Sequence, residues 1–156
     1  MIKTRIGAVL LAAGLLGATP ALAQTKVGSV DTTFRLLGAN DRVVIDRYDD
    51  PDVPNASCYV SHAATGGVSG SLGLAEDPSR FSIACRATGP VAWPEKLPDK
   101  QRVFSQALSV FFKHLEVYRL LDREKKVVLY LVISSRLKEG SPFNSISAVA
   151  TTPTAP

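Results

Sequence analysis

The sequence predicts a mainly β domain, a small sandwich or partly closed barrel, held together by one disulfide. Short runs rich in Val, Ile and Tyr recur between turn residues along most of the chain, which is typical of a domain built from short strands. Residues 115–121 and 127–133 flank a charged reversal, as the two arms of a hairpin would. The alternative is a β-rich α+β domain with a helix at 102–114.

The beginning of the chain predicts export. Lys3 and Arg5 precede an apolar run at residues 6–18, and a small-x-small triplet ends at Ala23. This order is typical of a secretory signal peptide, so we expect cleavage after Ala23 and a mature chain that starts at Gln24. The run is shorter than the roughly 20 residues that a helix needs to cross a bilayer.

Three segments follow from this cleavage: a signal peptide at 1–23, one domain at 24–150 and a disordered tail at 151–156. The whole chain carries 18 basic and 14 acidic side chains. Lys3 and Arg5 leave with the signal peptide, so the mature net charge is 16 minus 14, or +2. A small charge of mixed sign argues against a nucleic-acid partner. We also expect no membrane span in the mature chain.

Cys58 and Cys85 are the two cysteines of the sequence. An even number of cysteines in an exported protein predicts a disulfide. The two positions are not arranged as C-x-x-C, so a thioredoxin-like redox site is not indicated. We therefore expect a structural bridge that either joins two sheets or anchors a loop.

The first half of the mature chain alternates strands with loops. Residues 26–30 and 42–48 have strand character, and 57–61 is a strand that carries Cys58. Between them, residues 49–55 hold two prolines and four Asp or Asn residues, which cannot continue a ladder. Residues 65–77 form a glycine-rich loop.

In the second half, residues 81–86 form a strand that carries Cys85, and the hairpin is followed by a short final strand at 145–149. The apolar arm at 127–133 predicts a central strand covered on both faces. The apolar residues of 102–114 fit one face of a helix and also the parity of a long strand; we favour the strand.

Seven short blocks mark a resemblance to a known family: 28–34, 49–53, 58–61, 65–67, 73–77, 139–142 and 144–149. In these blocks the chain resembles the CreA family of small exported bacterial proteins, whose name refers to a catabolite-regulation locus. The resemblance implies a periplasmic location. It supplies no cofactor and no catalytic residue that could be transferred to this chain.

Two loops supply the candidate ligand-binding residues. The acidic loop at 49–55 offers carboxylates that Ca²⁺ could use as ligands, but it lacks the glycine and the distal glutamate of an EF-hand. The glycine loop could form an anion-binding nest, although glycine also serves where backbones pass closely. The candidates are Asp49, Asp50, Asp52, Thr65, Gly66, Gly67, Glu76 and Asp77.

These features favour a non-enzymatic binding or interaction module of the cell envelope, with the two loops as one exposed recognition surface. The partner would be an envelope protein or a small ligand, with no cofactor and no metal. One alternative is a small hydrolase of envelope polymers that uses loop carboxylates as acid and base. Another is a structural envelope component. The two histidines, His62 and His114, are expected to be hydrogen-bonded or on the surface.

Overall fold

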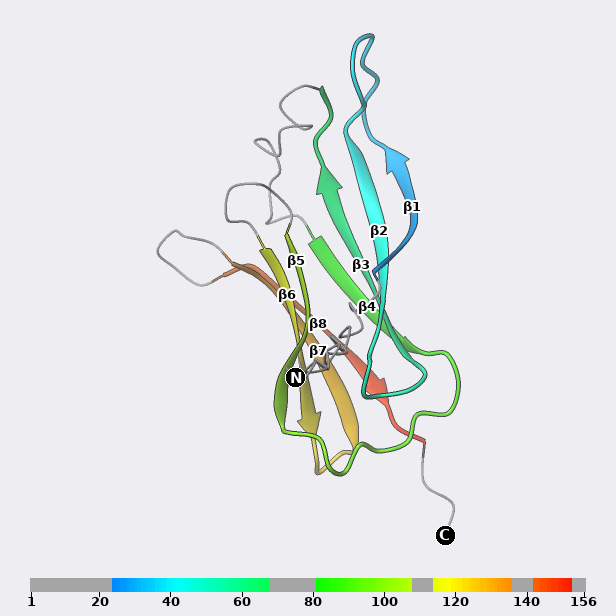
Figure 1. Cartoon of the computed structure of the whole chain (residues 1–156), viewed down its shortest axis with the longest axis vertical. Coiled ribbons are helices and arrows are strands. Elements are labelled where there is room, and N and C mark those ends of the chain that lie inside the picture. Colours follow the sequence, from blue (N-terminus) through cyan, green and yellow to red (C-terminus); the bar gives the residue numbers. More distant parts are fainter. Residues whose placement is uncertain (1–23, 68–80, 108–113, 136–141, 153–156) are drawn as a thin grey trace, which may run out of the picture.

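The computed structural model describes residues 24–67, 81–107, 114–135 and 142–152. These residues form two four-stranded antiparallel sheets, with strand orders β1-β2-β3-β4 and β5-β6-β7-β8 (Figure 1). The strands are β1 (Thr25–Asp31), β2 (Arg42–Asp49), β3 (Ala56–Ala64), β4 (Phe81–Ala87), β5 (Lys100–Ala107), β6 (His114–Asp122), β7 (Val127–Ser135) and β8 (Asn144–Ala150).

The mainly β prediction is confirmed, and the two sheets form a sandwich rather than a closed barrel. The stretch at 102–107 belongs to strand β5, so the helical alternative is wrong there. Residues 108–113 lie outside the described residues. A bulge in β5 shifts the register between Arg102 and Phe104.

The hairpin predicted around residue 124 is formed by β6 and β7. Lys126 takes a positive φ of 53° in the turn, and the Lys125 amide donates to Asp122 Oδ1 at 3.1 Å. Strand β7 is central in its sheet, but only one of its faces is fully buried, at Val128, Tyr130 and Val132. The alternate residues are half-buried, because each sheet of a two-layer sandwich has one inner face.

The core lies between the two sheets. The first sheet contributes Tyr48, Val60 and Ile83, and the second contributes Phe104 and Val117 among others. The layers meet along β4 and β8, where the Cys85 amide donates to Ser147 Oγ at 2.8 Å. Away from this edge, the rings of Tyr48 and Phe104 pack with centroids 4.8 Å apart.

The disulfide between Cys58 and Cys85 is confirmed. Its two residues face each other on the neighbouring strands β3 and β4, and both are almost fully buried. The bridge therefore lies within one sheet, and the expectation of an intersheet or loop-anchoring disulfide is wrong. The inner-face parity of the two strands explains this position, since both cysteines point into the core.

Candidate ligand-binding site

The two loops that the sequence nominated lie at opposite ends of the first sheet. Strands β2 and β3 pair from Asp49 with Ser57 at one end to Arg42 with Ala64 at the other. Seven residue steps of a strand separate these ends by about 23 Å. The described nominees of the two loops, Asp49–Asp52 and Thr65–Gly67, therefore do not share one surface, because they lie at opposite ends of strand β3. Glu76 and Asp77 lie outside the described residues.

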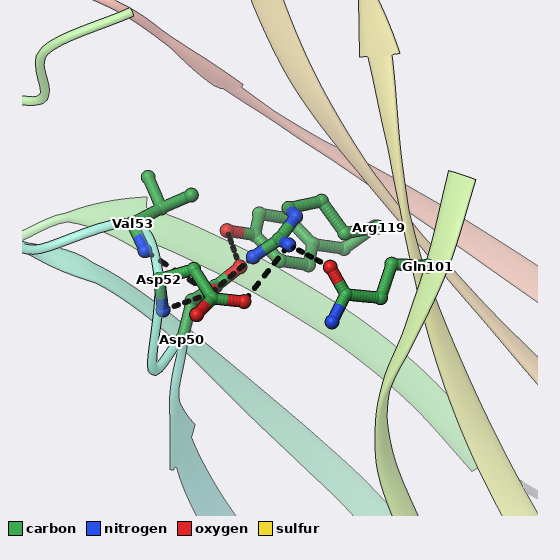
Figure 2. A network of polar contacts seen from close by, with 6 residues as sticks. Asp50, Asp52, Val53, Gln101 and Arg119 are labelled. Carbon is green, nitrogen blue, oxygen red and sulfur yellow. Dashed lines mark hydrogen bonds and ion pairs between the residues drawn. The ribbon is translucent and has the colours of Figure 1, made fainter. Parts of the chain in front are cut away.

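At the acidic end, Asp50 is buried between the sheets (Figure 2). Its carboxylate accepts hydrogen bonds from the amides of Asp52 and Val53, at 2.9 and 3.1 Å. It also accepts from Arg119 Nη1 at 2.6 Å and from the Tyr130 hydroxyl at 2.7 Å. Burial, followed by the neighbouring Asp50 carboxylate, raises the pKa of Tyr130 far above its usual value.

Arg119 completes this network, and its side chain has no exposed surface. Its Nη2 donates to Asp52 Oδ2 at 3.0 Å and to Gln101 Oε1 at 2.5 Å. The network therefore joins the loop after β2 to the second sheet. Asp50 is an anchor between sheets, since a buried carboxylate that already accepts four donors is not available to a ligand. Asp49 accepts from Ser57 and stays at the surface.

The sequence contained one signal for Arg119. Leu115, Val117 and Leu121 alternate along β6 and are buried, and Arg119 occupies the same parity between them. A charged residue at a core position requires a buried partner of opposite charge. Its partner is 69 positions away in the sequence, so the strand pattern could not identify it.

At the opposite end, the first glycines of the loop after β3 pack against the β1–β2 connection, residues 32–41, called here the hairpin tip. Asp41 Oδ1 accepts from the Gly66 amide at 2.7 Å, and the Gly67 amide donates to the Ala39 carbonyl at 2.9 Å. A Cβ at Gly66 would lie 1.9 Å from the Ala39 carbonyl oxygen. The close approach of two backbones therefore requires glycine here, and both amides are occupied within the chain rather than open to an anion.

Asp41 organises the hairpin tip. Besides the Gly66 amide, its carboxylate accepts from Arg35 Nη2 at 2.9 Å and from Thr33 Oγ1 at 3.1 Å. The Gly66 hydrogen bond, followed by that of Arg35, lowers the pKa of Asp41 below its ordinary value of 3.8. The Arg35 amide donates to Asn40 Oδ1 at 2.8 Å, so the tip has a defined backbone.

The pKa of Asp41 gives a testable prediction. A carboxylate with a lowered folded pKa contributes stability above its unfolded value of 3.8, and this contribution is lost as pH falls through the folded pKa. In an NMR titration, the Gly66 amide should therefore shift with an apparent pKa below 3.8. The Asp41→Asn variant should lack this transition. A midpoint at or above 3.8 in the wild type would contradict the contact.

An open pocket of about 740 Å³ lies beside the tip. Strands β2, β3 and β4 contribute to its walls, and its polar lining includes Thr33, Asp41, His62 and Thr65. A volume of this size is within the range of small-molecule and side-chain binding sites. Of the six nominated residues that the structure describes, Thr65 is the one that lines it.

His62 and Asp46 form a buried pair at this pocket. His62 Nε2 lies 2.9 Å from Asp46 Oδ2, and the two side chains are 9% and 3% exposed. The other ring nitrogen of His62 has no hydrogen-bond partner among the described residues. Ser61 points to the other face of β3 and bonds Ser82 at 2.9 Å, so it does not complete a Ser-His-Asp arrangement.

Comparison with known proteins places the chain in a family. It matches the family described as "CreA protein" over residues 27–154. The chain belongs to the CreA family. It is 40% identical to Protein CreA of Escherichia coli K12 over 149 residues, which covers 93% of this chain and 95% of that protein. Protein CreA of Escherichia coli O157:H7 shows the same identity and coverage. No solved structure matches.

The CreA match spans both the buried network and the pocket. Two of the blocks that suggested the family, 28–34 and 65–67, meet through Asp41, which accepts from Thr33 of the first block and from Gly66 of the second. A third block, 49–53, contains the buried anchor Asp50. Within the residues that the structure describes, no three His, Cys, Asp or Glu side chains gather as a metal site. No helix in that part of the chain is long and apolar enough to cross a membrane.

Proposed function

We propose that this CreA-family protein is a periplasmic, non-enzymatic binding module that recognises an envelope protein through its hairpin tip and the adjacent pocket. The observation that carries the proposal is the exposure of three large apolar side chains on the hairpin tip, whose Thr33 and Asp41 line the pocket. Phe34, Leu36 and Leu37 are 82%, 88% and 89% exposed. Burying a leucine or phenylalanine side chain is worth about 1.5–3 kcal/mol, so exposed residues of this kind are typical of binding sites.

The tip is organised before any partner binds. Asp41 and Asn40 hold its polar atoms inward, while the apolar side chains point to solvent. The hairpin reaches the end of the long axis of the molecule (Figure 1), where a partner can approach it. A preformed binding segment loses little conformational entropy on association, which favours a specific contact.

The arrangement gives no comparable support to the other two hypotheses. A hydrolase that used the acidic loop would need accessible carboxylates, whereas Asp50 is buried and paired with Arg119. A structural component would be expected to present a flat apolar surface. The apolar side chains of the tip instead project from a narrow hairpin, whose base contributes to a pocket of mixed polar and apolar lining.

Site-specific photocrosslinking in intact cells tests the proposal. A photoreactive residue at Leu37 should give one discrete protein adduct, and fractionation should find it in the periplasm. The same residue at Glu124 should not give that adduct, because Glu124 is exposed in the β6–β7 turn, and this turn lies at the opposite end of the molecule (Figure 1). The Ala63→Arg substitution, which would fill the pocket from a half-buried position, should remove the Leu37 adduct.

A complementation assay in a deletion strain tests whether the apolar side chains of the tip are needed for function in cells. The triple variant Phe34→Ser, Leu36→Ser and Leu37→Ser should keep its thermal stability, because the three side chains are exposed, but should not complement. The control variant Glu124→Ala should complement. If the triple variant complements fully, or if Ala63→Arg leaves the adduct unchanged, the proposal is wrong.

A further inference from the structure

Strand β1 forms a free edge of the first sheet. It pairs with β2 on one side, and the sheet order places no strand on its other side among the described residues. Six of its seven residues are exposed, and Val27 and Val30 are 55% and 65% exposed. An edge strand of this kind presents unpaired backbone groups that can bind another strand.

Gly28 lies in the middle of β1, next to the shift of register between Lys26 and Gly28, and glycine in a strand often marks such a bulge. A Cβ at this position would meet no atom within 4 Å, and its φ is not among the positive ones. The side of Gly28 is therefore open within the described part of the chain and leaves room for a side chain of a neighbouring strand.

A bulge in β1 decides which residues share a face. The register shifts between Lys26 and Gly28, so Lys26 faces Asp46 and Asp31 faces Arg42. Lys26 and Asp31 consequently lie on the inner face of the sheet, although an unbulged strand would place them on opposite faces. Gly28 and Val30 face Ile45 and Val43, on the outer face.

We propose that β1 pairs antiparallel with β1 of a second copy of this chain, around a two-fold axis at Ser29. Opposed residues of an antiparallel pair must share a face. With the axis at Ser29, Val30 lies opposite Gly28 of the second copy. Beyond the bulge, Asp31 lies opposite Lys26. The two first sheets then form one continuous sheet across the dimer.

Charge complementarity identifies the occupant as a second copy. Symmetry forms the Asp31–Lys26 pair twice, once at each end of the paired strands, and opposite charges directly across an antiparallel pair are stabilising. The space above Gly28 accommodates the exposed Val30 side chain. An edge lysine and a bulge discourage pairing with arbitrary strands, whereas the proposed register gives Lys26 an opposite charge. Any shifted register would lose both ion pairs. Asp31 Oδ2 also accepts from Asn40 Nδ2 of the hairpin tip at 3.0 Å, so Lys26→Asp is the variant that separates this self-association from the tip.

Sedimentation analysis of the mature, oxidised chain tests the dimer. The wild type should have twice the monomer mass. Lys26→Asp and Asp31→Lys should each give monomers, because each places like charges opposite one another, and the combined variant Lys26→Asp with Asp31→Lys should dimerise again. Glu124→Lys, a charge reversal far from the edge, should leave the dimer intact.

Two outcomes would overturn the proposal. One is a wild type that remains monomeric at its highest soluble concentration. The other is a dimer that persists in both single charge variants.

Discussion

Replacing Asp50 with alanine is expected to lower the free energy of unfolding by about 3–5 kcal/mol, since removing one partner of a buried ion pair leaves the other charge uncompensated. Arg119 would retain only Asp52 and Gln101 as partners, and Asp52 is 38% exposed. The amides of Asp52 and Val53 would also lose their shared acceptor, Asp50 Oδ1. Urea denaturation followed by circular dichroism measures this loss.

The neighbouring residue supplies the matched control for Asp50→Ala. The Asp49 carboxylate is 56% exposed, so Asp49→Ala should cost at most about 1 kcal/mol, as expected for surface contacts. The pair Asp50→Ala with Arg119→Met should lose clearly less than the sum of the two single variants, because it removes both charges together. If Asp50→Ala were as stable as Asp49→Ala, the anchoring role would be wrong.

Reducing the disulfide is expected to have the second large effect. Cys58 and Cys85 are 27 positions apart, and closing a loop of this length is worth about 3.5 kcal/mol in the chain-entropy model. Typical domains have a net stability of only about 5–15 kcal/mol. We therefore expect a marked decrease in the urea midpoint when the mature protein is unfolded with a thiol reductant.

The variant with both cysteines replaced by alanine is the control for the reductant. It should unfold at a lower urea concentration than the oxidised wild type, and added reductant should not change its midpoint. Both sulfurs lie in the core, so the variant also loses packing and should be somewhat less stable than the reduced wild type. Equal midpoints for oxidised and reduced wild type would contradict a stabilising bridge.

Several features of the fold were predictable because they depend on local patterns. Alternation along residues 42–48 and the charged reversal after Leu121 predicted strand β2 and the β6–β7 hairpin, both of which the structure contains. The pairing of Cys58 with Cys85 followed from their number and the expected export. Cleavage after Ala23 stays a prediction, since residues 1–23 lie outside the described part.

The candidate site was less predictable. Thr65 was nominated and lines the pocket, but Asp41, His62 and the apolar hairpin tip were not singled out as parts of one site. Their contacts depend on how the β1–β2 connection folds against Gly66. Asp50 was nominated as a ligand because it lies in a polar loop, where side chains are usually exposed. The packing of the second sheet buries its carboxylate against Arg119 and Tyr130.

By itself, the sequence determined the mainly β class, the disulfide pairing and the resemblance to the CreA family. The class and the resemblance follow from strand periodicity, turn residues and short motifs, which are encoded over a few neighbouring positions. The disulfide pairing follows from the presence of two cysteines in a chain expected to be exported. Only the tertiary structure decided which end of the first sheet carries the pocket and that Asp50 meets Arg119. Contacts between sheets join residues far apart in the chain, and their register depends on how the whole core packs.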